Sequence, residues 1–208
     1  MTHDRACAAD GMSVGTRTKV GEAVGWHIDW RVDRYDEKAT AWVKARSGLL
    51  EPQRADFDDL GVEPYSSTEL VGNLLTTAGL TRLTSLLTAG GGQALTNTSG
   101  RIGVGNGAGS AAVGDTDLGA SAGAANRYFQ PFDATYPQVA AGVVTCRSTF
   151  GSSDGNHAWN EFGIDIGTPT VAGGTTVGAT LLNHKTSIAQ GTKASGQTWV
   201  ATATVTFS

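Results

Sequence analysis

The chain has 208 residues, with 15 basic and 19 acidic side chains and a formal net charge of −4. This length suits one large domain or two small ones, and lysine and arginine do not cluster as they do in nucleic-acid-binding proteins. No stretch approaches the roughly 20 apolar residues of a membrane helix, so neither nucleic acid nor a membrane is expected as a partner. The 29 glycines favour short strands and tight turns over helices.

The first 20 residues have no apolar central run of the kind that secretory signals carry, which predicts a soluble protein made in a cytoplasm. Two cysteines, Cys7 and Cys146, are too few for a disulfide framework, and a bridge between them stays open. Composition changes near residue 70, because most charged side chains precede it and most glycines follow it. This change predicts two parts, residues 1–70 and 71–208, either as two modules or as one core with a charged extension.

The N-terminal part begins with VGWHIDWRV, residues 24–32, in which bulky apolar and polar side chains alternate. A period of two predicts a half-buried strand. A charged turn near Asp36 and the stretch ATAWVKARSG, residues 39–48, then predict a β-hairpin. Its exposed positions carry both signs of charge, which fits either a solvated face or a docking surface for a partner. Residues 47–67 show no period and predict a long loop or arm, of a length that is usually functional or ordered by a partner.

The stretch TTAGLTRLTSLLTAGGG predicts one short amphipathic helix near residues 77–89. Thr76 or Thr77 can accept a backbone N–H at its start, and the glycines from residue 90 favour the left-handed conformation that ends a helix. Its leucines recur at steps of three, three and one and form an apolar stripe: Leu80, Leu83, Leu86 and Leu87. A helix of about three turns is marginal by itself, so we expect the stripe to pack on a sheet.

From residue 100 onward, short strands alternate with turns. Strands are expected at residues 101–105, 142–150, 158–167, 179–188 and 197–208, with a loop rich in glycine, alanine and serine between the first two. Several short strands separated by turn signals predict a mainly β protein with an antiparallel, jelly-roll-like β-sandwich core. The charged β-hairpin and the long loop are expected to extend this core at its N-terminal side.

Two motifs suggest ligand binding but lack what it requires. In RIGVGNGAGS, Gly103, Gly105 and Ala108 match a dinucleotide fingerprint, but a run with poor helix propensity follows where a helix is needed. In GDTDLG, Asp115 and Asp117 have the spacing of a calcium loop, but Asn126 stands at the position of the closing glutamate that such a loop needs. No cofactor is therefore expected, and only a weak incidental cation site stays open.

The stretch GNHAWNEFGIDIG, residues 155–167, raises the question of catalysis because His157 and Glu161 lie four residues apart. In a strand these residues are about 13 Å apart at the usual rise, so their side chains cannot share a metal ion. His184 and Ser187 offer members of a hydrolytic triad, but nothing places a third member. We expect no catalytic and no metal site here, and interpret the stretch as a core strand in which Trp159 is buried and Glu161 caps a neighbouring backbone.

The order of motifs from about residue 72 to residue 208 resembles a family of tailed-bacteriophage virion proteins. The motifs are, in order, NLLTTAGLTRLTSLL, IGVGNG…DTDLGAS, NRYFQPFDATYP, VVTCRSTFGSSDGNHAWNEFGID and LLNHKTS…GTKASGQTWVATATVTFS. The WNEFGI element with the later LLN is also similar to the E-x-G-[IL] strand of phage tail-collar fibre domains. The first 70 residues carry no such resemblance.

This resemblance implies a structural protein of the virion and no enzymatic activity. The function it implies first is a capsid decoration or minor capsid protein, which binds the major capsid protein and stabilises the head lattice. Homo-oligomers are expected, and a trimer would suit the local symmetry axes of a head. A tail, collar or fibre-base component is the alternative, and an enzyme or carbohydrate-binding module on a virion is ranked last.

Large aromatic side chains of the N-terminal part are the candidate interface residues, because tryptophan and tyrosine are enriched at binding hot spots. The set is Trp26, Trp30, Trp42, Phe57 and Tyr65. Plain packing in a core is the other interpretation of the three tryptophans.

Overall fold

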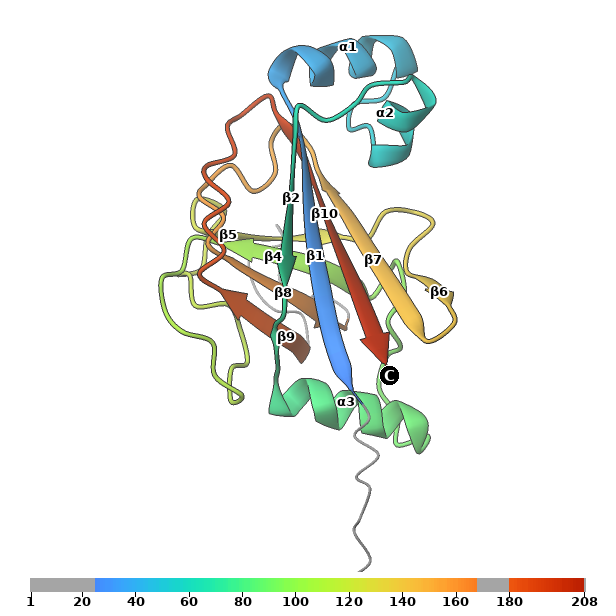
Figure 1. Cartoon of the computed structure of the whole chain (residues 1–208), viewed down its shortest axis with the longest axis vertical. Helices are drawn as coiled ribbons and strands as arrows, with labels where there is room; N and C mark the ends of the chain where they lie inside the picture. The colour runs from blue at the N-terminus through green and yellow to red at the C-terminus, as the bar shows by residue number, and fades with distance from the viewer. Residues whose placement is uncertain (1–24, 168–179, 208) are drawn as a thin grey trace, which may run out of the picture.

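The computed structural model of the chain describes residues 25–167 and 180–207. Two antiparallel sheets of five strands each make up most of this part, and three helices lie at their margins (Figure 1). The expectation of a mainly β protein is confirmed. None of the helices that the structure describes is long and apolar enough to cross a membrane.

The first sheet, sheet A, has the strand order β2-β1-β10-β7-β6. Its strands are β1 (Trp26–Tyr35), β2 (Ser66–Val71), β6 (Gln138–Ala140), β7 (Val143–Phe150) and β10 (Thr198–Phe207). In its centre, β1 pairs with β10 over its whole length, from Trp26 opposite Phe207 to Tyr35 opposite Thr198. The first described strand is thus bound to the last one, so the composition change near residue 70 does not divide the core.

The second sheet, sheet B, has the strand order β3-β9-β8-β4-β5. Its strands are β3 (Leu74–Leu75), β4 (Gly100–Gly105), β5 (Arg127–Pro131), β8 (Glu161–Ile166) and β9 (Thr180–Thr186). The strands of the two sheets cross steeply in Figure 1. Along the described chain, the strands pass from sheet A to sheet B and back twice.

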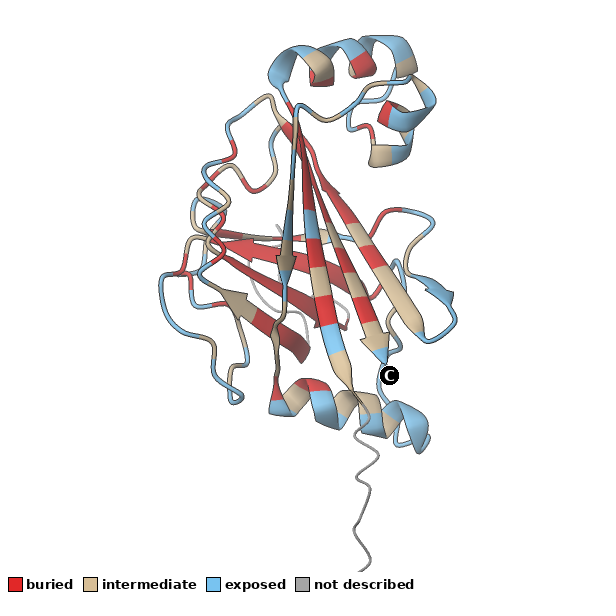
Figure 2. Cartoon of the chain, viewed as in Figure 1, coloured by how far each residue is buried: buried red, intermediate tan, exposed pale blue. Residues whose placement is uncertain are grey.

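The main core lies between the sheets and is rich in aromatic side chains. Trp30 of β1 stacks on Phe162 of β8 at 4.7 Å between ring centres, and Trp159 packs edge-on against Phe150 and Trp199. All five side chains are almost wholly buried, and β8 is buried over its whole length (Figure 2). Burial of aromatic side chains, which have the largest apolar area, is the main stabilising contribution to such a core.

The predicted β-hairpin is wrong, because its second half is helix α1 (Glu37–Ser47). The side chain of Asp36 accepts a hydrogen bond from the backbone N–H of Ala39, and Gly48 ends the helix with φ 71°. The buried side chains of α1 are Thr40 and Val43, and this spacing of three suits a helix, not a strand. The alternation in ATAWVKARSG was too short to distinguish the two.

The long loop predicted for residues 47–67 is wrong in part, because it contains helix α2 (Arg54–Asp59) and the start of β2. Helix α3 (Thr77–Leu87) confirms the predicted helix, and the Thr76 side chain accepts a hydrogen bond from the backbone N–H of Gly79. The five predicted strands of the second half correspond to β4, β7, β8, β9 and β10. Cys146 is a buried free thiol, and Cys7 lies outside the described residues.

Candidate functional site

Helices α1 and α2 form a cap over one end of sheet A (Figure 1). Each helix is held at its start by a side-chain hydrogen bond: Asp36 accepts from the backbone N–H of Ala39 in α1, and Asp56 of α2 accepts from the backbone N–H of Gln53 at 2.7 Å. These caps satisfy backbone N–H groups that have no partner inside a helix. Local sequence therefore defines both helices, although α2 has only 6 residues.

The cap has a small apolar core of its own. Tyr35, Val43, Phe57 and Val200 are buried together in a cluster separate from the main core. The rings of Tyr35 and Phe57 lie 4.1 Å apart between their centres. Because Val200 belongs to β10 and Tyr35 to β1, this cluster fixes both helices directly on the central strands of sheet A.

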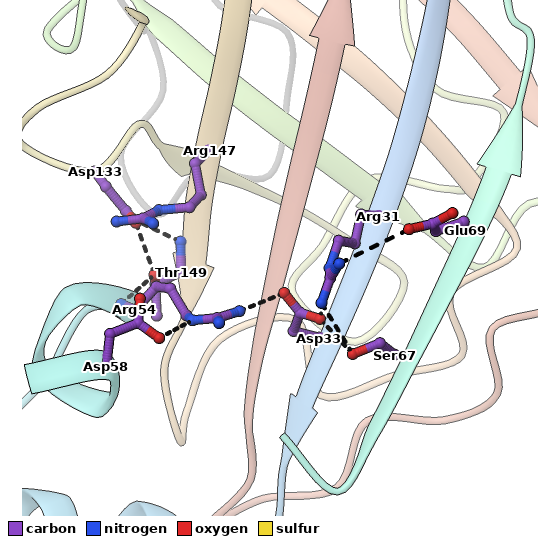
Figure 3. Close-up of polar contacts among 9 residues, drawn as sticks. All are labelled: Arg31, Asp33, Arg54, Asp58, Ser67, Glu69, Asp133, Arg147 and Thr149. Atoms are coloured by element: carbon purple, nitrogen blue, oxygen red, sulfur yellow. Dashed lines mark hydrogen bonds and ion pairs between the residues drawn. The ribbon is translucent and has the colours of Figure 1, made fainter. Parts of the chain in front are cut away.

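A polar network on the outer face of sheet A also holds the cap (Figure 3). The buried carboxylate of Asp33 accepts hydrogen bonds from Arg31, Ser67 and, across the gap to α2, Arg54. Arg54 also donates to Asp58 at 2.7 Å and, through its backbone N–H, to the hydroxyl of Thr149 at 3.1 Å. One arginine thus links α2 to β1 and to β7.

A second carboxylate, Asp133, completes this network (Figure 3). It accepts hydrogen bonds from the Arg147 guanidinium at 2.7 Å and from the backbone N–H of Thr149 at 2.9 Å. Burial raises the pKa of Asp133 more than these bonds lower it. Because Thr149 contacts both Asp133 and Arg54, the network runs continuously from the loop before β6 to the cap.

The cap carries exposed apolar and aromatic side chains on this rigid base. Trp42 is 43 % exposed, Tyr65 56 % and Leu50 88 %, and the Arg46 guanidinium lies 5.5 Å from the centre of the Trp42 ring. A shallow cavity of about 370 Å³ beside Trp42 is lined by Asp36, Lys38, Ala39, Leu60, Gly61 and Val62. An exposed tryptophan with an arginine and a surrounding rim of charges has the composition of a protein–protein interface.

The structure separates the five candidate interface residues. Trp30 and Phe57 are almost wholly buried, because the first fills the main core and the second the cap core. Both are corrections to the predicted set, since neither can contact a partner without opening the fold. Trp26 is half-buried at the opposite end of β1, edge-on against Phe207 at 5.3 Å. Trp42 and Tyr65 alone remain exposed at the cap.

The second half of the stretch GNHAWNEFGIDIG is β8, the central strand of sheet B, as predicted, whereas Trp159 lies just before this strand. Trp159 is wholly buried. The Glu161 carboxylate accepts hydrogen bonds from the backbone N–H groups of Gly107, Gly119 and Ala120, at 2.8 to 3.2 Å. The predicted backbone cap is confirmed, and its target is the glycine-rich loop between β4 and β5.

Sequence reasoning missed a cluster of Glu161, His184 and Asp115. The His184 ring lies between the two carboxylates, with Nε2 2.8 Å from Glu161 Oε2 and Nδ1 2.6 Å from Asp115 Oδ2. Burial alone would lower the pKa of His184, but the bonds to Glu161 and Asp115 raise it. Burial alone would raise the pKa of Glu161, but the hydrogen bonds from His184, Gly119 and Ala120 lower it more, so the pKa lies below its usual value. Both ring nitrogens are occupied, so this cluster binds the loop to the sheet and leaves no imidazole nitrogen for a substrate proton.

The other motifs with a chemical interpretation have separate partners. Asp115 contacts His184, whereas Asp117 pairs with Arg127 at 2.8 Å, so the two aspartates of GDTDLG do not converge. Gly103 and Gly105 belong to strand β4, with no helix directly after it. His157 contacts the carbonyl of Ala158, away from Glu161. In the described ranges, no group of three or more histidine, cysteine, aspartate or glutamate side chains is placed to hold a metal ion.

Comparisons of the chain with known protein families, with curated proteins and with solved structures found no match.

Proposed function

We propose that the chain is a structural protein of a bacteriophage virion, a capsid decoration or minor capsid protein that binds the head lattice and stabilises it. The observation that carries the proposal is the exposed Trp42 with Leu50 on a cap that is fixed to the sheets by its own apolar core and by the Asp33–Arg54 contact. Binding energy concentrates in such aromatic anchors when their support is rigid. The motif order of residues 72–208 is the reason for naming a virion.

Within this proposal the major capsid protein or another virion protein is the partner of the cap. The chain binds rather than catalyses, and its place is the virion. The two sheets form a jelly-roll-like sandwich, which the repeated passage of the chain between the sheets supports. Such a stiff β-core suits a protein that must survive on the outside of a particle.

A tail, collar or fibre-base component is the second candidate. Its support is the WNEFGI element, which lies in and just before β8 at the centre of sheet B. Glu161 of this element holds the β4–β5 loop, so a tail-collar-like role would be a property of the core and that loop, not of the cap.

The test is binding of the purified protein to separated heads and tails of the phage that encodes it, followed by copy-number counting on intact virions. Many copies on heads, with binding lost in Trp42→Ala and kept in Val71→Ser, support decoration through the cap. Val71 is a matched control because it is 73 % exposed and lies at the far end of β2. A few copies on tails support the second candidate. Absence of the chain from the virion would overturn both.

A further inference from the structure

The end of the molecule opposite the cap carries α3 and the end of β10 (Figure 1), and apolar side chains are exposed there. We call this surface the end face, and its exposed members are Leu80, Leu86, Leu87, Val139 and Phe207. They come from α3, β6 and the last residues of β10. Leu87 and Val139 are 86 % and 73 % exposed, and Figure 2 shows the exposed bands of α3 and β6.

Helix α3 explains why this surface stays open. It contacts sheet B most closely through Gly79, where an added Cβ would overlap the backbone of Leu182. Leu83 and Leu86 line a groove beside that contact, whereas Leu80 and Leu87 project away from it and are more than half exposed. The prediction that the whole leucine stripe packs on a sheet is therefore only half right.

The groove between α3 and the strand ends is almost purely apolar. Its volume is about 180 Å³, and Trp26, Leu83, Pro137, Val139, Val144 and Phe207 are among the side chains that line it. An apolar groove that continues into exposed leucine, valine and phenylalanine is typical of a surface that another protein covers.

Among the described residues, the segments that form the end face carry little charge, and the pair of His27 and Asp29 on β1 lies at its border, opposite Thr206 and Thr204. From Val71 to Gly100 the sequence contains one charged side chain, Arg82, which contacts Thr180 of β9. Between Ala134 and Cys146 there is none, and between Val200 and Phe207 there is none. A partner that buries this surface should therefore carry no charge at the contact, because such a charge would lose its hydration and find no opposite charge there.

Strand β6 adds a backbone feature to the same surface. It is an edge of sheet A and pairs only with β7 among the described strands. All three of its residues are exposed, and Val139 stands in the middle of the strand. The other edge of this sheet, β2, carries Glu69 beside Arg31. Edge strands are protected from pairing by charged side chains, by proline or by being short; β6 carries no charge, and its protection is limited to its length of three residues and to Pro137 before it.

We propose that the end face is a self-association surface, covered by the end face of a second copy of this chain. The end face is complementary to itself, because its groove is apolar, it carries little charge, and it presents a short open strand edge. Contact between identical patches closes into a symmetric oligomer, of which a twofold dimer is the simplest. The surface lies opposite the cap, so an oligomer built in this way leaves Trp42 free.

The test is the oligomeric state of the purified full chain, measured by light scattering or sedimentation over a concentration series, without any phage component. We expect wild type to form a closed oligomer that persists when salt is raised, since screening weakens ion pairs and not apolar contacts. Leu87→Glu and Val139→Asp are each expected to raise the dissociation constant at least about tenfold, because each buries an unpaired charge.

Leu50→Glu is the matched control, because Leu50 at the cap is 88 % exposed and Leu87 is 86 % exposed. This variant should associate as wild type does. In a Cys7→Ser background, an unreactive Cys146 shows that each variant is folded, since that thiol is wholly buried and burial raises its pKa to about 12.

Three outcomes would overturn the inference: a monomeric wild type at about 100 μM, where even a micromolar interface would be populated, an oligomer that Leu87→Glu leaves intact, or one that only Leu50→Glu dissociates. None of them bears on head or tail binding, so the inference and the proposed function fail separately.

Discussion

The two ends of the molecule expose apolar side chains in opposite settings. At the cap, Trp42 and Leu50 stand among charged neighbours on two helices that are fixed by buried polar contacts. At the end face, leucines of α3, Val139 of the short edge strand β6 and Phe207 at the end of β10 are exposed with few charged neighbours. Charges around an apolar anchor give an interface its choice of partner, whereas a charge-free patch selects only for another apolar surface. This difference is the basis of our two proposals, a distinct partner at the cap and a second copy at the end face.

The largest expected effect tests whether the cap depends on its own core. Phe57→Ala removes a wholly buried ring that packs against the Tyr35 ring, and we expect a loss of about 3–5 kcal/mol in the free energy of unfolding. Denaturant titration measures it. The control at the other end is Phe207→Ala, which removes a ring that is 40 % exposed and should cost clearly less. Equal losses would contradict the view that the cap is anchored while the end face is open.

The second prediction concerns the polar contact that fixes the cap. Arg54→Ala leaves Asp33 buried but still bonded to Arg31 and Ser67. We therefore expect a cost of about 2–3 kcal/mol, below that of a buried carboxylate with no partner left. Arg46→Ala, which removes an exposed guanidinium near Trp42, should change stability by no more than about 0.5 kcal/mol.

A double variant separates the ion pair from packing. If Arg54→Ala costs the same in an Asp33→Asn background as in wild type, the two side chains are not coupled and the network does not hold the cap.

Local sequence was enough for the elements whose pattern is long or has clear ends. The alternation of β10 runs over 10 residues, and α3 has a threonine cap at its start and glycines beyond its end. Helix α1 was missed because its sequence also allows a short alternation, with Thr40 and Trp42 on one face, whereas the residues that the helix buries, Thr40 and Val43, are three apart. Its decisive signal was Asp36 followed by helix-forming residues and then Gly48, a start and stop that outweigh a weak period.

The cluster of Glu161, His184 and Asp115 could not be predicted from spacing. Its members are 23 and 69 residues apart along the chain. The sheet register brings them together, since Gly163 lies opposite His184 and thus places Glu161 diagonally across from it. Such pairs depend on which strands are neighbours, and this is decided by burial over the whole chain. The glycines of the β4–β5 region have a matching role, because a Cβ added at Gly105, Gly107 or Gly119 would lie too close to the Glu161 carboxylate.

The smallest predicted effect uses pH to distinguish the two ends. The pKa of Glu161 is lowered below 4.5 because hydrogen bonds outweigh burial, so its stabilisation is present at higher pH and is lost as pH falls through the lowered pKa. The pKa of Asp133 is raised above 3.8 by burial, so protonation of Asp133 favours the folded state. His184 has a raised pKa, and its stabilisation is lost only as pH rises above 6.5, through that raised pKa.

Acid should therefore loosen the β4–β5 loop, which contacts α3 through the backbone of Thr77 and Val113, before it loosens the cap. The measurement is hydrogen exchange as a function of pH, corrected for intrinsic rates. The amides of Gly119 and Ala120, which donate to Glu161, report on the loop, and the amide of Thr149, which donates to Asp133, reports on the cap side. Glu161→Gln should cost about 1–2 kcal/mol near neutral pH, because the NH2 group that replaces one carboxylate oxygen cannot accept from a backbone N–H, and it should remove the acid dependence at Gly119. If Thr149 loses protection first, the assignment of acid sensitivity to the α3 side is wrong, and the cap is the weaker end.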